Sequence, residues 1–178
     1  MYNEYIMNIY RKKIFALAEE PKAKIFFNSR LEHSLVVHTA IVKYSKEHIY
    51  ILCRSFCDDI IVENKEYLIY MDSFLSNPKR KVKILFSDYK EEFKEKKLYK
   101  IFKAHKNQVE MKKTNCKFFK DNKEINFTVS DGRTFRFELN AEKKIAVGNF
   151  NNEKQAKKLE DFFLETFNSE KSNNIYWN

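Results

Sequence analysis

Apolar positions along the chain recur with two different periods, which predict where helices and strands lie. From residue 2 to residue 20 they return every three or four positions, which predicts a helix that Pro21 ends. His48–Cys53 and Lys81–Phe86 are short, nearly continuous runs of β-forming residues, typical of interior strands. Further helices are expected over 30–46, over 58–75 and after a Ser87-Asp88 cap, with a third strand over 108–112 and a strand or packing loop over 24–27.

The second half of the chain changes to an alternation of polar and apolar residues, which predicts antiparallel strands. Residues 124–129 and 135–139 alternate on either side of Asp131-Gly132, a hairpin turn signal. Segment 144–148 returns as a further strand, and Asn151 or Asn152 caps a last helix. The order of elements predicts an α/β fold: one mixed β-sheet flanked by helices, with a C-terminal β-meander and helix and an extra N-terminal helix.

These elements divide the chain into one domain with two short appendages. The predicted boundaries are an N-terminal helix over 1–22, the α/β domain over 23–168 and a flexible polar tail over 169–178. A chain of 178 residues is long enough to bury a sizeable core and too short for two such domains.

The composition excludes several kinds of site. The chain has two glycines, too few for a dinucleotide-binding fingerprint, and neither has the spacing of a P-loop. No apolar run reaches transmembrane length, so we expect no membrane contact. Three cysteines cannot all pair, which fits a reducing cytoplasm. Cys53 and Cys57 lack a compact set of further ligands, so we expect neither a metal nor any cofactor.

Positive charge is concentrated in one part of the chain. Segment 79–123 holds 16 Lys and Arg against 6 Asp and Glu, whereas the rest holds 18 against 19. Such a segment is the electrostatic footprint of a nucleic-acid contact, or else its lysines coat solvated helix faces. The residues that we assign to a nucleic-acid contact are Lys79, Arg80, Lys81, Lys96, Lys97, Lys100, Lys103 and Lys106.

Two short motifs in the meander resemble the active hairpin of the phospholipase D superfamily. That hairpin reads H-x-K-x-x-x-x-D-G and is followed, after a second strand, by G-S-x-N. Asp131-Gly132 matches the D-G, and G-N-F-N at 148–151 resembles the G-S-x-N. Together with the element order, these motifs make residues 28–167 resemble one phospholipase D half-domain, which implies a mixed sheet flanked by helices.

The catalytic positions of that motif are changed in this chain. Counting back from Asp131, the histidine position holds Glu124 and the lysine position holds Asn126. The family's chemistry uses the histidine as the nucleophile and the lysine to neutralise phosphate charge. The resemblance therefore carries over no catalytic residue, and the chain is expected not to be an enzyme. A nuclease or phosphodiesterase with a rearranged site is the alternative.

The remaining polar residues of the hairpin form a vestigial site or an interface. Strand alternation puts Glu124, Asn126 and Thr128 on one face, and Arg136 and Glu138 are expected to share it across the turn. The simplest interpretation is a cross-strand pair of Arg136 with a glutamate. The functional interpretation is a pocket that binds without cleaving. The residues assigned to the vestigial site or interface are Glu124, Asn126, Thr128, Asp131, Arg136, Glu138, Asn149 and Asn151.

A lone half-domain implies a partner, because members of the superfamily pair two halves across the hairpin. We expect a homodimer or a subunit of a larger complex, with Arg136 of one copy facing Glu124 or Glu138 of the other. Contact through the N-terminal helix is the alternative. Small phospholipase D-like proteins occur in bacterial anti-phage systems, which by analogy suggests a defence complex. The predicted function is a non-catalytic, partner-binding subunit in the cytoplasm, and non-specific nucleic-acid binding through 79–123 is the other candidate.

Overall fold

An eight-stranded sheet forms the centre of the computed structural model, which describes residues 2–56, 59–120, 123–140 and 143–177. Its strand order is β1-β9-β8-β7-β2-β3-β4-β10, and β5 and β6 pair separately. The strands are β1 (Phe26–Asn28), β2 (His48–Cys53), β3 (Lys81–Phe86), β4 (Val109–Thr114), β5 (Phe119–Lys120), β6 (Lys123–Glu124), β7 (Phe127–Ser130), β8 (Thr134–Asn140), β9 (Ile145–Asn149) and β10 (Ser172–Asn174).

The sheet is mixed, as the sequence predicts. Strands β2, β3 and β4 are parallel, whereas β7, β8, β9 and β1 extend the sheet from β2 as antiparallel neighbours. The antiparallel part starts at a tight turn in which Asp131 and Gly132 have φ of 54° and 64°. Ser130 pairs with Thr134 across this turn, and Asp and Gly tolerate the positive φ that it requires better than most residues do.

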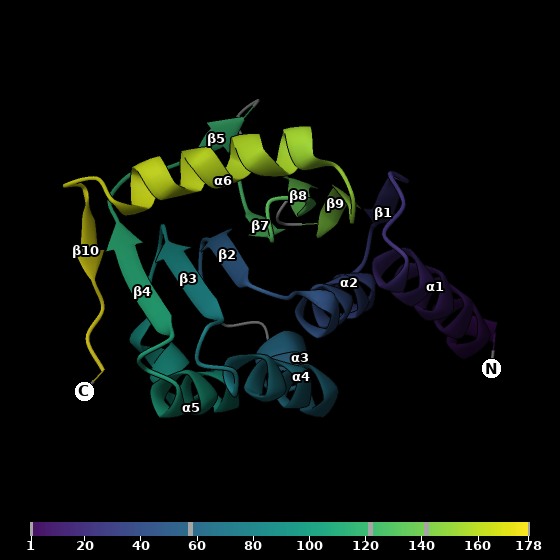
Figure 1. The fold of residues 1–178 in the computed structure, drawn as a ribbon, viewed down its shortest axis with the longest axis horizontal. Helices are drawn as coiled ribbons and strands as arrows, with labels where there is room; N and C mark the ends of the chain where they lie inside the picture. The colour runs from purple at the N-terminus through teal and green to yellow at the C-terminus, as the bar shows by residue number, and fades with distance from the viewer. Residues whose placement is uncertain (1, 57–58, 121–122, 141–142, 178) are drawn as a thin grey trace.

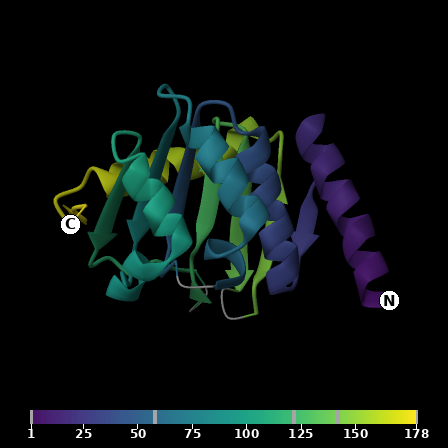
Figure 2. The same ribbon diagram turned by 90° about the horizontal axis from the view of Figure 1, so that it is seen from below.

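Helices cover both faces of the sheet (Figure 1). One face carries α6 (Glu153–Phe167), and the other carries α2 (Leu31–Tyr44), α4 (Lys65–Leu75) and α5 (Lys97–Ala104). Figure 2 shows this second layer from below, with α1 (Tyr2–Glu19) outside it, beside the edge strand β1. Two short turns of helix, α3 (Asp59–Val62) and η1 (Glu91–Glu95), precede α4 and α5.

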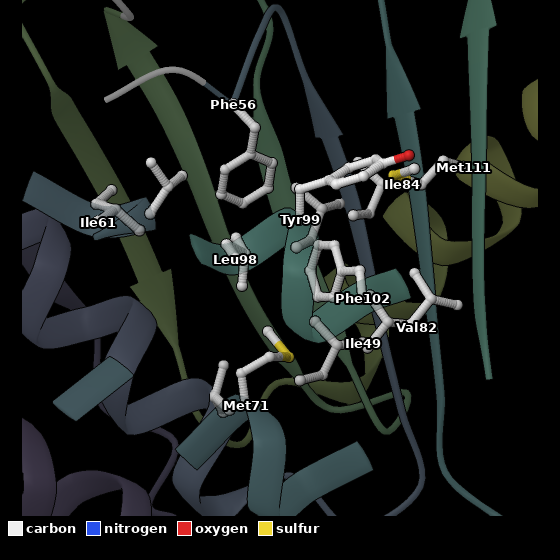
Figure 3. Packing of buried hydrophobic residues seen from close by; sticks show 14 of the residues in the cluster. Ile49, Phe56, Ile61, Met71, Val82, Ile84, Leu98, Tyr99, Phe102 and Met111 are labelled. Atoms are coloured by element: carbon white, nitrogen blue, oxygen red, sulfur yellow. The ribbon is translucent and has the colours of Figure 1, made fainter. Parts of the chain in front are cut away.

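The largest hydrophobic cluster lies between the parallel strands and the α4–α5 layer (Figure 3). Ile49, Val82 and Met111 come from three neighbouring strands and pack with Leu98 and Phe102 of α5. All five side chains are buried. Burial of a side chain of this size contributes about 1.5–3 kcal/mol. This cluster fixes the parallel strands, and with them the ends of β2 and β3.

Two segments differ from the pattern-based expectation. The single helix expected over 58–75 is divided into α3 and α4, because the Asn64 side chain accepts the N–H of Tyr67 at 3.0 Å and caps a new helix. The tail expected to be flexible instead forms β10, which pairs with β4, and Trp177 packs on Tyr99. Strand pairing uses main-chain groups, so the polar composition of the tail does not prevent it.

The described helices give no sign of a membrane span. None of them combines the length and the apolar character that crossing a bilayer requires.

Candidate functional site

Polar side chains gather beneath α2, near the C-terminal end of the central strand β2. They line a partly enclosed cavity of about 60 Å³, room for about four water molecules. Its walls come from α2, from the end of β2 and the loop after it, from α3, and from the meander. The lining residues are Ser34, His38, Ile51, Leu52, Cys53, Ser55, Phe56, Ile61, Asn126, Phe127, Thr128, Arg136, Glu138 and Lys144.

A chain of hydrogen bonds holds the meander side of this cavity in place. Arg136 is 2% exposed, and its Nη2 donates to Glu138 Oε1 at 2.9 Å while its Nε donates to Asn28 Oδ1 at 3.1 Å. Asn126 Nδ2 donates to the other oxygen of Glu138 at 2.8 Å. Asn28 Nδ2 donates in turn to the carbonyl of Lys144 at 2.6 Å. Both oxygens of the buried Glu138 carboxylate are therefore satisfied within the chain.

The alternation of the hairpin explains why these groups share a face. Phe127, Val129 and Phe135 belong to the cluster under α6, so their neighbours Thr128 and Arg136 point to the opposite face, beneath α2. Arg136 does pair with a glutamate, but that glutamate is Glu138 of the same strand, β8, and not a residue across the hairpin as the sequence suggests. Because α2 buries this pair, Arg136 does not face a second copy as the sequence suggests.

The α2 side of the cavity carries an imidazole in an unusual environment. Burial and the positive charges of Arg136 and Lys144 lower the pKa of His38 well below its ordinary value. The imidazole is therefore neutral at pH 7. Within the described ranges, the side chains of His38, Ser34 and Thr128 make no hydrogen bond to another residue.

The other hairpin residues singled out from the sequence lie elsewhere. Asp131 accepts the backbone N–H groups of residues 46, 47 and 48 at 2.7–3.0 Å, which ties the hairpin turn to the start of β2. Asn149 lies opposite Phe135 in the register of β8 and β9, about 10 Å along the strand from Glu138. Asn151 Nδ2 donates to the carbonyl of Pro21 at 3.1 Å. Asp131 and Asn151 thus join separate elements, and none of these three residues lines the cavity.

Glu124 lies just outside the cavity. Its Oε1 accepts the hydroxyl of Ser87 at 3.0 Å, and its Oε2 lies 3.9 Å from Arg54 Nε. The structure thus brings together Asn126, Thr128, Arg136 and Glu138 of the predicted set and leaves Glu124 at their rim.

The basic residues assigned from segment 79–123 lie along α5, beyond both of its ends, and at the start of β3. Lys96 and Lys97 lie at the start of α5 and form ion pairs with Asp59 at 2.7 Å and Glu63 at 3.0 Å. Hydrogen bonds from Lys97, first of all from its backbone N–H, lower the pKa of Glu63. The remaining residues lie along α5, at its far end and at the start of β3: Lys79, Arg80, Lys81, Lys100, Lys103 and Lys106.

Arg80 and Lys81 donate hydrogen bonds to main-chain carbonyls. Arg80 Nε donates to the carbonyl of Lys46 at 3.1 Å, and Lys81 Nζ donates to that of Asn107 at 2.9 Å. A carbonyl carries no net charge, so both side chains keep their positive charge.

Metal ligands are not assembled in the described part of the chain. No three His, Cys, Asp or Glu side chains lie together there as a metal site requires. Cys57, which the sequence offers as a ligand with Cys53, lies outside the described residues.

Comparison with known proteins identifies the fold. No protein-family model and no curated protein sequence matches the chain. Among solved structures, Nuc of Salmonella typhimurium, a phospholipase D family member, matches with a TM-score of 0.55 and 11% identity over 86% of this chain and 97% of its own. The chain has a phospholipase D-like fold.

Two further structures resemble this phospholipase D-like chain over smaller shares of their length. TrmBL2, an archaeal chromatin protein described with a novel mode of DNA binding, matches with a TM-score of 0.58 and 14% identity, over 94% of this chain and 61% of its own. Phosphatidylserine synthase of Haemophilus influenzae Rd KW20 matches with a TM-score of 0.52 and 9% identity, over 85% and 39%.

Sequence reasoning missed Ser34, His38 and Lys144, which line the cavity, and Asn28, which hydrogen-bonds Arg136 beside it. Asn28, Ser34, His38 and Lys144 come from β1, α2 and the turn before β9. None belongs to a motif, and Asn28 lies 108 positions from the Arg136 that it contacts. Only Asn28 carried a local signal, as a polar residue directly after an apolar segment.

Proposed function

We propose that this chain is a non-catalytic phospholipase D-like module that works by binding a partner. One observation carries the proposal: the positions that the resemblance gives to histidine and lysine hold Glu124 and Asn126, and both side chains are engaged within the chain. A carboxylate repels an anionic phosphodiester, and a hydrogen-bonded amide brings no charge to neutralise one.

The competing proposal of a rearranged nuclease would have to use His38. This imidazole is neutral and lines the cavity, so it has the protonation state of a nucleophile. The cavity, however, holds about 60 Å³, whereas sites for drug-sized ligands enclose about 300–1,000 Å³. This difference in volume argues against a nucleotide as the ligand of this cavity.

We expect the purified protein to leave single-stranded and double-stranded DNA and RNA uncut, with or without a divalent metal. The reason is that the family's histidine and lysine are replaced by Glu124 and Asn126 and that the cavity is small. Gel electrophoresis after prolonged incubation measures this directly. The His38→Ala variant is the control that separates a contaminating nuclease from activity of this site: cleavage that disappears in His38→Ala contradicts the proposal.

The partner surface that we favour lies at the α1–β1 end of the molecule. Five large apolar side chains are exposed there, out of nine on the described chain. We call them the end patch: Tyr5, Ile6, Ile9, Ile25 and Phe27. Tyr10 donates from its hydroxyl to the carbonyl of Phe27 at 3.0 Å, which joins α1 to the edge strand. Exposed apolar groups concentrated in this way mark interaction sites.

A second copy of the chain is the occupant that the charges of α1 favour. Glu4 lies in the first turn of α1, and Lys12 and Lys13 follow in its middle. Two copies of α1 packed antiparallel about a two-fold axis bring Glu4 of each toward the lysines of the other. The end patch then forms the apolar centre of a self-complementary interface.

We expect light scattering at micromolar concentration to show a dimer, and Ile9→Glu to weaken its association at least about tenfold by placing a charge in the interface. The matched control is Ile69→Glu on α4, since Ile69 is 55% exposed and Ile9 is 49% exposed. A monomeric wild-type protein, or equal loss of the dimer in both variants, would contradict a dimer formed through the end patch.

Nucleic acid is the second candidate partner. The likeness to TrmBL2 and the exposed lysines of α5 support it, whereas the ion pairs of Lys96 and Lys97 weaken the basic surface. Binding of this kind is non-specific and falls steeply with salt, so a native gel of the uncut samples at two salt concentrations separates it from protein–protein association. A setting in anti-phage defence remains a prediction by analogy.

A further inference from the structure

Positive charge gathers at the end of the sheet where its parallel strands begin, which lies along the upper edge of Figure 2. The hairpin turn after β7 lies beside the start of β2, and α6 begins here too, since the N–H of Asn152 donates to the carbonyl of Arg133. Eight Lys and Arg stand against three Asp and Glu in the segments that meet at this end, which are 45–47, 76–81, 105–108, 131–133 and 150–157. We call the eight cations the basic end: Lys46, Lys79, Arg80, Lys81, Lys106, Arg133, Lys154 and Lys157.

The charges of the basic end are not neutralised by neighbouring carboxylates. Within the described residues, none of its eight cations forms an ion pair. The carboxylate of Asp131 instead accepts the backbone N–H groups of residues 46–48. At the opposite end of the parallel strands the charges are paired, because Asp88 lies 3.4 Å from Nε of Arg54 and 3.0 Å from Nζ of Lys90. The surface charge of the molecule is therefore divided, with unpaired cations at one end.

One guanidinium of the basic end is held in place by the fold. Arg80 Nε donates to the carbonyl of Lys46 at 3.1 Å, and the guanidinium carbon lies 5.1 Å from the centre of the Phe74 ring. In the described part of the chain, its two terminal nitrogens make no hydrogen bond. A fixed guanidinium with two available nitrogens suits a phosphate group, because it can donate to two phosphate oxygens at once.

Helix stability accounts for some of these cations but not for those of α6. Lys79 and Lys106 lie just beyond the C-terminal ends of α4 and α5, where the helix dipole favours positive charge. Lys154 and Lys157 lie in the first turns of α6, where the dipole disfavours it. Charge placed against a local preference is typical of a functional surface.

We propose that the basic end binds the phosphate backbone of double-stranded DNA without reading its bases. Four strand spacings of about 4.8 Å separate β8, which follows Arg133, from β4, which follows Lys106, so the cations extend over about 19 Å. The major groove of DNA is roughly 12 Å wide, so cations spread in this way reach both of its strands. The inference gives the second candidate partner a defined surface, goes beyond the proposed function and does not rest on the end patch.

Other polyanionic partners match the basic end less well. Single-stranded nucleic acid stacks on aromatic side chains, whereas Phe150, the only Phe, Tyr or Trp of these segments, is 3% exposed. Acidic membrane surfaces take up apolar side chains, and none of the large apolar side chains exposed on the described chain belongs to these segments. Duplex RNA is recognised through its 2′-hydroxyls, but the side-chain oxygens of Asn77 and Asn152 already accept backbone N–H groups.

The test is fluorescence anisotropy of the full chain with a short labelled DNA duplex. We expect affinity to fall about a hundredfold between about 50 and 200 mM salt, as about four phosphate contacts require. The double variant Lys154→Gln, Lys157→Gln is expected to weaken binding at least about fivefold and to reduce the slope of log affinity against log salt by about two, since two contacts are lost.

The matched control is Lys113→Gln, Lys117→Gln, which removes the same charge from two exposed residues at the other end of β4. Unchanged salt dependence in this control, with the loss in Lys154→Gln, Lys157→Gln, supports the proposal. Equal losses in the two double variants, no binding of duplex DNA at about 50 mM salt, or tighter binding of single-stranded DNA, duplex RNA or acidic phospholipid vesicles would overturn it. Circular dichroism checks that both variants are folded. Light scattering on the same samples reports separately on the dimer, so failure of this inference is distinguishable from failure of the proposed function.

Discussion

Replacing Arg136 by methionine is expected to lower the free energy of unfolding by about 3–5 kcal/mol. The guanidinium is 2% exposed and hydrogen-bonds both Glu138 and Asn28, so its removal leaves a buried carboxylate that is 7% exposed and has no counter-charge. Urea unfolding at pH 7, followed by circular dichroism, measures the loss. The midpoint is expected to fall while the slope stays constant, as it does when the two folded states bury similar surface.

The double variant Arg136→Met, Glu138→Leu tests the reason for this loss. It removes both charges, so the penalty of an unpaired buried carboxylate disappears, and most of the lost stability is expected to return. If the double variant is less stable than Arg136→Met alone, the side chain of Arg136 contributes mainly through packing, and the electrostatic explanation is wrong.

Gly148→Ala is expected to destabilise the fold by about 1–3 kcal/mol, through overpacking. A Cβ at this position would lie 2.3 Å from Cζ of Phe26 and 2.5 Å from the carbonyl oxygen of Phe135. The Phe26 ring crosses directly over Gly148, its partner in the β1–β9 register, and packs on Phe150. Thermal unfolding measures the effect, and an unchanged Tm would show that β1 moves away from β9 at little cost.

The double variant Phe26→Leu, Gly148→Ala separates the two contacts. A smaller side chain at position 26 relieves the clash with the ring but not the clash with the Phe135 carbonyl. We therefore expect the two substitutions to be non-additive by more than about 0.5 kcal/mol, with part of the loss remaining. Additive effects would mean that the carbonyl alone excludes a side chain at this position.

The pattern of the sequence predicts the sheet better than it predicts what covers the sheet. Alternation along 124–138 correctly places Asn126, Thr128, Arg136 and Glu138 on one face. It does not show that α2 lies over that face, because a period of two reports which side chains share a side and not which element packs there. Arg136 therefore suggests an exposed interface from the sequence and is an internal cation in the structure.

For the motif residues, the sequence predicts the local backbone conformation but not the long-range contacts. The D-G pair correctly marks a hairpin turn, since its positive φ values are a local property. The partners of Asp131 are backbone groups of residues 46–48, more than eighty positions away, which no local pattern shows. Gly148 likewise resembles a motif glycine. The Phe26 ring that lies against it comes from the neighbouring edge strand β1, far away in the sequence.

The positions of β1 and β10 in the sheet constrain the order in which it can form. β1 is made early but pairs with β9, so it waits without its partner while most of the chain is synthesised. β4 in turn keeps an open edge until residues 172–174 arrive as β10. Unpaired strand edges invite pairing with other chains. Nascent chains that stall before residue 172 therefore expose the β4 edge, and a chaperone or a second nascent chain would meet this protein there.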